Sequence, residues 1–185
     1  MATSPATSAA VTLWKIDPAH STADFKVRHM MIANVKGAIK GITGDLTENT
    51  TDASQSSIEA KLDVTTIHTG EAQRDTHLKS ADFLDTEKYP AITFKSTKVE
   101  KKGDAMYSVT GDLTLHGVTQ PVTLKVEGPT QPHKDPWGNT RIGLEASTKI
   151  NRKDFGLTWN AALETGGVLV GEDVHITIEL ELIKS

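Results

Sequence analysis

His20 and Ser21 are adjacent in the chain, and Asp17 and Asp24 lie close by. These are the residue types of a hydroxyl nucleophile with its general base. The chain contains no G-x-S-x-G segment, which would present a serine on a sharp turn. Neighbouring residues of a strand also point to opposite faces, so His20 is poorly placed to take the proton of Ser21. The sequence predicts hydrogen bonding at the start of a strand, no catalytic residue and no enzyme.

Several side chains are of the types that bind metal ions: His20, His29, His68, Asp75, His77 and His116. Asp75 and His77 are two residues apart on an expected helix, so their side chains should diverge. The chain has neither an H-x-E nor an H-E-x-x-H spacing. We therefore expect no metal site and no cofactor.

Two short segments combine arginine with aspartate, Arg74-Asp75 and Arg152 to Asp154. Arginine can hold a carboxylate through two hydrogen bonds. We expect these charges to fasten irregular segments to the rim of the fold, in preference to binding the polar head group of a ligand. The polar rim candidates are His20, Arg74, Asp75, His77, Arg152 and Asp154.

The composition limits the function classes. With 185 residues, 37% hydrophobic content and a net charge of −4, the chain suits one globular domain. Its 20 Lys and Arg residues are scattered, which argues against nucleic-acid binding. Residues 1–12 read as a flexible lead-in, and residues 13–185 as a single domain. The start lacks the basic and apolar regions of a secretory signal, and no apolar stretch is long enough for a membrane span. We therefore expect a cytoplasmic location, or a periplasmic one if a signal has been removed.

The dominant pattern is a period of two. In 174–182, 107–116, 122–126 and 142–146, apolar and polar residues alternate, as in half-buried strands. Alternation stops at Thr69 to Ser80, which favours a short helix with Thr69 as its cap. Hairpin follows hairpin without βαβ units, so we expect a mainly all-β, antiparallel fold of about 8–10 strands. Sheets of that size usually close or fold over, and composition alone leaves both a hollow barrel and a filled sandwich open.

Four ordered segments resemble the YceI-like family. The first runs from Trp14 to Ser21, followed by Phe25, Val27 and His29; the second is Arg74 to Asp85, continuing through Tyr89 to Ser96. The third is Gly111 to Thr119, and the fourth is Asn151 to Gly156. The similarity extends from about Trp14 to Ile183.

This resemblance implies an extended, lipocalin-like antiparallel barrel whose apolar interior binds a long-chain polyisoprenoid lipid. It also implies that a homodimer can form, and that many members are periplasmic. We expect a non-catalytic binding protein for transport or storage. Two alternatives stay open: an enzyme acting on a small lipid or isoprenoid at the barrel mouth, and a ligand-free interaction module.

The residues expected to face the barrel interior are large apolar side chains on the predicted strands and beside the helix. They are Phe25, Val27, Leu78, Phe83, Phe94, Val109, Leu113, Leu115, Leu144, Phe155, Trp159, Ile176 and Ile178.

Overall fold

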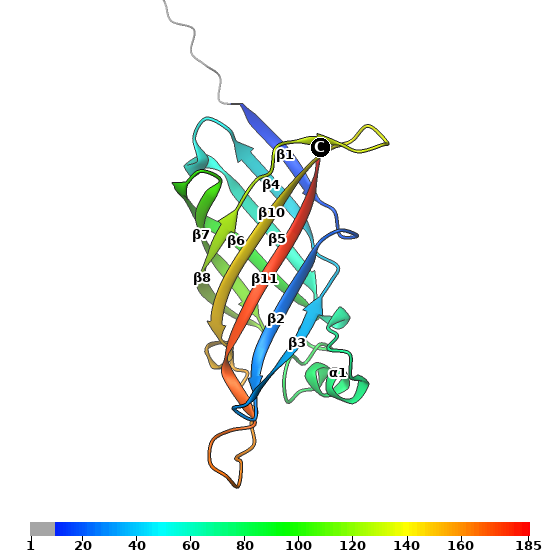
Figure 1. Ribbon diagram of the computed structural model, residues 1–185, viewed down its shortest axis with the longest axis vertical. Helices are drawn as coiled ribbons and strands as arrows, with labels where there is room; N and C mark the ends of the chain where they lie inside the picture. The colour runs from blue at the N-terminus through cyan, green and yellow to red at the C-terminus, as the bar shows by residue number, and fades with distance from the viewer. Residues whose placement is uncertain (1–9) are drawn as a thin grey trace, which may run out of the picture.

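The computed structural model describes residues 10–185, which form one antiparallel sheet of eleven strands with a single α-helix (Figure 1). The strands are β1 Val11–Ile16, β2 Thr22–His29, β3 Ala33–Ile39, β4 Thr43–Asn49, β5 Ser57–Asp63, β6 Ala91–Gly103, β7 Met106–Leu115, β8 Val118–Glu127, β9 His133–Lys134, β10 Thr140–Asn151 and β11 Val170–Lys184. The helices are α1 Ala72–Lys79 and three single 3₁₀ turns, η1 Ala53–Gln55, η2 Val64–Thr66 and η3 Arg152–Phe155.

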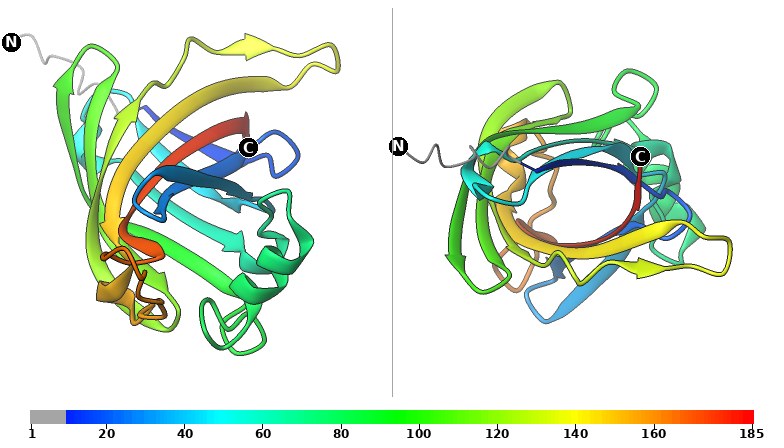
Figure 2. Two further views of the ribbon diagram at one scale, coloured as in Figure 1. Left: turned by 60° about the horizontal axis from the view of Figure 1, so that its bottom comes forward. Right: turned by 90° about the horizontal axis from the view of Figure 1, so that it is seen from above.

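The sheet closes on itself. Its order is β3-β2-β11-β1-β4-β5-β6-β7-β8-β10-β9, and β10 also pairs with β11. That pairing is long, from Arg141 opposite Ile183 to Asn151 opposite Asp173. Closure leaves the ring of β1, β4, β5, β6, β7, β8, β10 and β11 without an open edge, and Figure 2 shows this ring from above. The predicted closed antiparallel barrel is confirmed.

Two strands share one side of β11. β1 pairs with its last residues, Leu182 to Lys184, and β2 pairs with its first ten, as far as Glu179. β3 continues the sheet beyond β2. The first strand begins at Val11, so residues 11 and 12 belong to the barrel and not to the predicted lead-in; residues 1–9 lie outside the described residues.

The barrel has two ends that differ in their connections (Figures 1 and 2). The α1 end carries α1, the β2–β3 turn, the β7–β8 turn, η3 and the segment 156–169. The opposite end carries the β4–β5 connection, the β6–β7 turn and the segment 128–139. No helix within residues 10–185 is long and apolar enough to cross a membrane.

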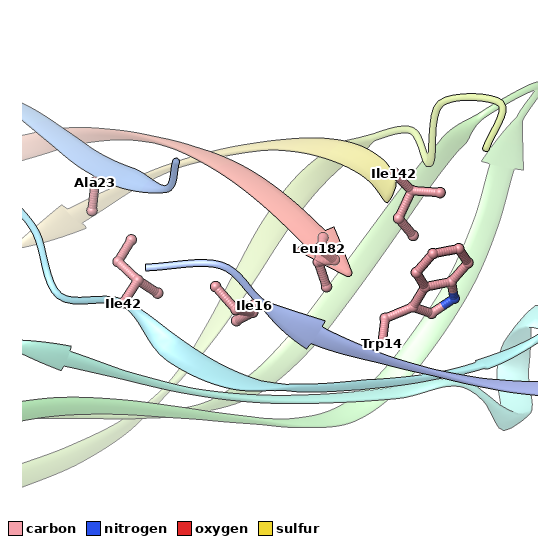
Figure 3. Close-up of a cluster of buried hydrophobic side chains, with 6 residues drawn as sticks. All are labelled: Trp14, Ile16, Ala23, Ile42, Ile142 and Leu182. Carbon is pink, nitrogen blue, oxygen red and sulfur yellow. The ribbon is translucent and has the colours of Figure 1, made fainter. Parts of the chain in front are cut away.

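Packed side chains fill one part of the interior. The cluster consists of Trp14, Ile16, Ala23, Ile42, Ile142 and Leu182, which project from β1, β2, β10, β11 and the β3–β4 link (Figure 3). The Trp14 indole Nε1 donates a hydrogen bond to Glu48 Oε2 at 2.8 Å, which satisfies its only polar atom. The buried side chains of β1, Trp14 and Ile16, therefore belong to the hydrophobic core.

The helical excursion lies where the sequence predicts it, but its cap is different. Glu71 is the N-cap, and its carboxylate accepts hydrogen bonds from the main-chain N–H groups of Gln73 and Arg74. The predicted cap, Thr69, is wrong. Its hydroxyl is instead bonded to Asp75 and Arg74, so it secures the helix from outside the first turn.

Candidate ligand-binding cavity

A cavity of about 710 Å³ occupies the barrel interior. All strands except β1 and β9 contribute lining residues, and most of these are Val, Leu, Ile, Ala or Phe. The lining reaches His29, His77 and Trp159 at the α1 end, and Glu48, Lys101 and Tyr107 at the opposite end. The volume is within the range of small-molecule sites, which are typically about 300–1,000 Å³. Because its lining residues come from both ends of the barrel, the cavity extends along the barrel, and its walls are mainly apolar.

Alternation along each strand produces this wall. On β7, Tyr107, Val109, Leu113 and Leu115 line the cavity. Gly111 shares their face, but a Cβ atom at this position would lie 2.5 Å from Phe94 Cζ. The Phe94 ring therefore lies over a glycine on the neighbouring strand, and it is the ring that reaches the cavity there.

The interior-facing candidates from the sequence all line the cavity except one. Phe155 is not among the lining residues. It is almost fully buried between Leu115, Ile150 and Leu157, where η3 packs under the end of the barrel. Phe155 is therefore core, because its side chain is enclosed by residues at the end of the barrel and does not reach the cavity.

The polar rim candidates divide into two groups. Arg74, His77 and Arg152 line the cavity at the α1 end. His20, Asp75 and Asp154 are not among the lining residues. The His20 ring is bonded to Asp17, 3.0 Å from Nδ1 to Oδ2, whereas the Ser21 hydroxyl contacts the main chain of Glu181. The two side chains have separate partners.

Arg74 and Asp75 both bind Thr69. Arg74 Nε donates to the Thr69 hydroxyl at 2.7 Å, and Arg74 Nη2 donates to its main-chain oxygen at 3.2 Å. Asp75 Oδ1 accepts from the hydroxyl and the main-chain N–H of Thr69. The Thr69 hydroxyl therefore lowers the pKa of Asp75, although desolvation opposes it. These bonds fasten α1 to the chain that precedes it.

Arg152 is buried and holds main-chain oxygens instead of a carboxylate. Its guanidinium donates to Leu157 O at 2.6 Å, Gly171 O at 2.8 Å, Trp159 O at 2.9 Å and Val170 O at 3.3 Å. Burial lowers its pKa, while Glu172 acts in the opposite direction. Asp154, by contrast, is exposed and is not a partner of this guanidinium. Arg152 joins the segment 156–169 to the start of β11.

An aromatic cluster closes part of the α1 end. The His77 ring lies edge-on to Phe83, with centroids 5.0 Å apart, and edge-on to Trp159 at 4.7 Å. His77 Nε2 is also 2.9 Å from Asp82 Oδ2. His77 and Phe83 are six residues apart, but Trp159 comes from a distant segment, so the sequence identified these residues but could not place Trp159 beside the other two. Their contact joins the helical excursion to the segment 156–169 across the cavity mouth.

The sequence missed a charged network on the outside of the barrel. Arg141 Nη1 donates to Asp17 Oδ2 at 2.7 Å and to Glu181 Oε1 at 2.6 Å, and Arg141 Nε donates to Asp135 Oδ2 at 2.8 Å. Arg141 and His20 lower the pKa of Asp17 to about 2. Asp17, His20 and Glu181 are close enough to share a cation, but the Arg141 guanidinium already supplies the positive charge between the carboxylates.

Buried polar side chains are satisfied by protein partners. Within residues 10–185, every buried side-chain nitrogen or oxygen has a hydrogen-bond partner. A closed antiparallel barrel of eight strands with a mainly apolar bore has room to hold one small ligand in its interior.

The chain belongs to the YceI-like domain family, which matches residues 14–182. It is 42% identical over 174 residues to Protein YceI of Escherichia coli O157:H7, covering 93% of this chain and 88% of that protein.

Two solved structures share the fold. BcnA of Burkholderia cenocepacia aligns with a TM-score of 0.75 at 23% identity, covering 90% of this chain and 98% of BcnA. A polyisoprenoid binding domain from Saccharophagus degradans aligns with a TM-score of 0.64 at 15% identity, covering 93% of this chain and 98% of the domain.

Proposed function

We propose that this protein is a non-catalytic binding protein that holds a long apolar lipid, of the polyisoprenoid type, for transport or storage. The observation that carries the proposal is the elongated cavity of about 710 Å³ with its predominantly aliphatic wall. An isoprenoid tail is aliphatic, like the cavity wall, and it is elongated, like the cavity. The fold shared with a polyisoprenoid binding domain is consistent with it.

Binding would be driven by the removal of apolar surface from water. Each methylene group that becomes buried contributes roughly 0.8 kcal/mol. The wall offers few polar groups to a tail, so the cavity would select length and shape more than functional groups. Arg74 and Arg152 are already bonded to protein oxygens, and this supports a structural role for them over a clamp on a head group.

The proposal is tested by titrating the purified protein with a prenol series of increasing length, namely geraniol, farnesol, geranylgeraniol and solanesol. Trp159 lines the cavity, so its fluorescence should change as the cavity fills, and Trp159→Phe identifies its part of the signal. We expect saturable binding of the long prenols at about one per chain. Absence of saturable binding of any prenol would contradict the proposal.

The same preparation addresses the enzyme alternative. A binding protein returns the prenol chemically unchanged after prolonged incubation, whereas an enzyme accumulates product. Homodimerisation and a cytoplasmic location also stay predictions, and sedimentation velocity tests the former.

A further inference from the structure

Three consecutive apolar side chains form the turn between β2 and β3, at the α1 end of the barrel. Met30 is 42% exposed, Met31 54% and Ile32 76%. The Ile32 N–H donates to the His29 main-chain oxygen at 3.1 Å, and φ is 50° at Met30 and 65° at Met31. These are the features of a type I′ turn, which favours Asn-Gly. The turn therefore exposes two methionines to water in a backbone conformation with positive φ, which residues other than glycine rarely adopt.

This turn borders the cavity mouth. Val27 and His29, which precede it, line the cavity, as does Leu169. The Met30 N–H donates to the main-chain oxygen of Leu169 at 2.8 Å, which holds the turn against the segment 156–169. Figure 1 shows the two side by side at the bottom of the molecule. The exposed apolar side chains therefore lie next to residues that line the cavity.

The charges around the turn are compatible with an anionic surface. Arg28 lies two residues before Met30 and is exposed, although it also contributes to the cavity lining. Among residues 10–185 it takes part in no salt bridge. Glu172 and Asp173, on the adjoining part of β11, are paired with Lys153 at 2.5 Å and Lys149 at 3.1 Å. Glu164, on the segment 156–169, is an exposed acid, so that segment should stay outside the apolar layer.

We propose that the α1 end docks onto a lipid bilayer, with Met30, Met31 and Ile32 inserted at the boundary between head groups and acyl chains. The inference rests on the proposed function, because a long isoprenoid chain resides in a membrane and must enter the cavity from it. A few apolar side chains, assisted by one cation, give weak and reversible adsorption. Such adsorption suits a carrier that has to leave the membrane with its cargo.

The opposite end of the barrel lacks this combination. Trp137 is 81% exposed, but it follows His133, Lys134 and Asp135 and does not line the cavity. Val11 and Leu13 are about as exposed as Met31, at 55% and 54%, but they lie on β1, which contributes nothing to the cavity wall. These two residues provide a control of similar apolar character and exposure, away from the β2–β3 turn.

The test is flotation of the protein with vesicles of phosphatidylethanolamine containing a minority of phosphatidylglycerol. In the principal variant, Met30→Asn/Met31→Gly/Ile32→Ser, the turn receives the residues that its backbone favours, so the fold should be at least as stable. We expect wild type to float with the vesicles and the variant to partition roughly tenfold more weakly. Val11→Ser/Leu13→Ser should float like wild type. Arg28→Gln should weaken flotation on these vesicles but not on pure phosphatidylcholine.

Any of three results would overturn the docking proposal: wild type does not float, the turn variant floats as well as wild type, or Val11→Ser/Leu13→Ser loses flotation as much as the turn variant does. Sedimentation velocity tests the alternative that the turn binds a second copy of this chain instead of a membrane. If wild type self-associates, the turn variant is monomeric and neither binds vesicles, the turn is an interface between copies of the chain and the proposal is wrong.

Delivery of solanesol from detergent micelles separates docking from ligand binding. Because micelles bypass the bilayer, the turn variant should take up solanesol to the same extent as wild type, while its uptake from vesicles should be slower. If neither protein takes up solanesol from micelles, the proposed function fails, and flotation still decides whether the turn docks.

Discussion

The guanidinium of Arg152 lies 2.6 Å from the main-chain oxygen of Leu157 and is buried with three further carbonyl oxygens around it. A carbonyl oxygen is a weaker partner for a cation than a carboxylate, but four of them satisfy the guanidinium. The arrangement holds the segment 156–169, with Trp159, beside the cavity mouth. The positive charge of Arg152 therefore has a structural role: it joins the segment 156–169 to the start of β11.

Replacing Arg152 with Ala should therefore lower the free energy of unfolding by roughly 3–5 kcal/mol, because several buried oxygens lose their donors. Arg152→Lys should recover only part of this loss, since one ammonium cannot reach all four oxygens. Chemical denaturation of the three proteins measures the difference. Unchanged stability of Arg152→Ala combined with lost prenol binding would show instead that Arg152 contacts the ligand.

The Asp17–Arg141 contact predicts a dependence of stability on acid pH. The pKa of Asp17 is lowered from 3.8 to about 2, by Arg141 first and His20 second. A lowered pKa means that the folded state favours the ionised carboxylate. This stabilisation is complete above 3.8 and is lost as the pH falls through about 2.

We therefore expect Asp17→Asn to be less stable than wild type at neutral pH, by about 2 kcal/mol, because a charge-assisted hydrogen bond is removed. The difference should shrink between pH 4 and pH 2, where wild type loses the same charge. Melting temperatures of both proteins across this range provide the measurement. A difference that stays constant down to pH 2 would contradict the assigned role of Asp17.

Affinity should depend on the length of the isoprenoid chain. Each additional isoprene unit buries more apolar surface while the cavity still has room, so the dissociation constant should fall along the series from geraniol to geranylgeraniol. It should level off once the tail reaches the rim, because further units stay in water. An affinity that is independent of chain length would show that the head group, and not the cavity wall, carries binding.

Local pattern was enough to predict the barrel wall. On β7 and β11, alternation identifies Val109, Leu113, Ile176 and Ile178 as residues of one face, because a strand has a side-chain period of two. Phe155 could not be assigned in this way, since it lies in η3, where no alternation exists.

Contacts between residues far apart in the chain could not be predicted from local pattern. Arg141 and Asp17 are 124 residues apart, and nothing in either neighbourhood indicates the other. The β2–β3 turn did carry a local signal. Met30, Met31 and Ile32 interrupt the alternation at a point where a hairpin would ordinarily have polar turn residues.

The interior location of Leu113 allows the most direct test of the central claim. Leu113 lines the cavity, whereas the hydroxyl of its neighbour Thr114 is bonded to Thr119 on the outer face, at 2.8 Å. Leu113→Glu would place a carboxylate against an apolar tail, which is strongly unfavourable, and Thr114→Glu would place the same group in water. Circular dichroism should first establish that both variants are folded, and Leu113→Ala, which only enlarges the cavity, replaces Leu113→Glu if that variant is not.

The deciding measurement is mass spectrometry of organic extracts from natively purified wild type, Leu113→Glu and Thr114→Glu. We predict a long-chain apolar lipid in amounts close to one per chain in wild type and Thr114→Glu, and its loss from Leu113→Glu. A Leu113→Ala protein should retain lipid, with a shift toward bulkier species. Wild-type protein that yields no lipid, and takes up none of the prenols on titration, would contradict the account.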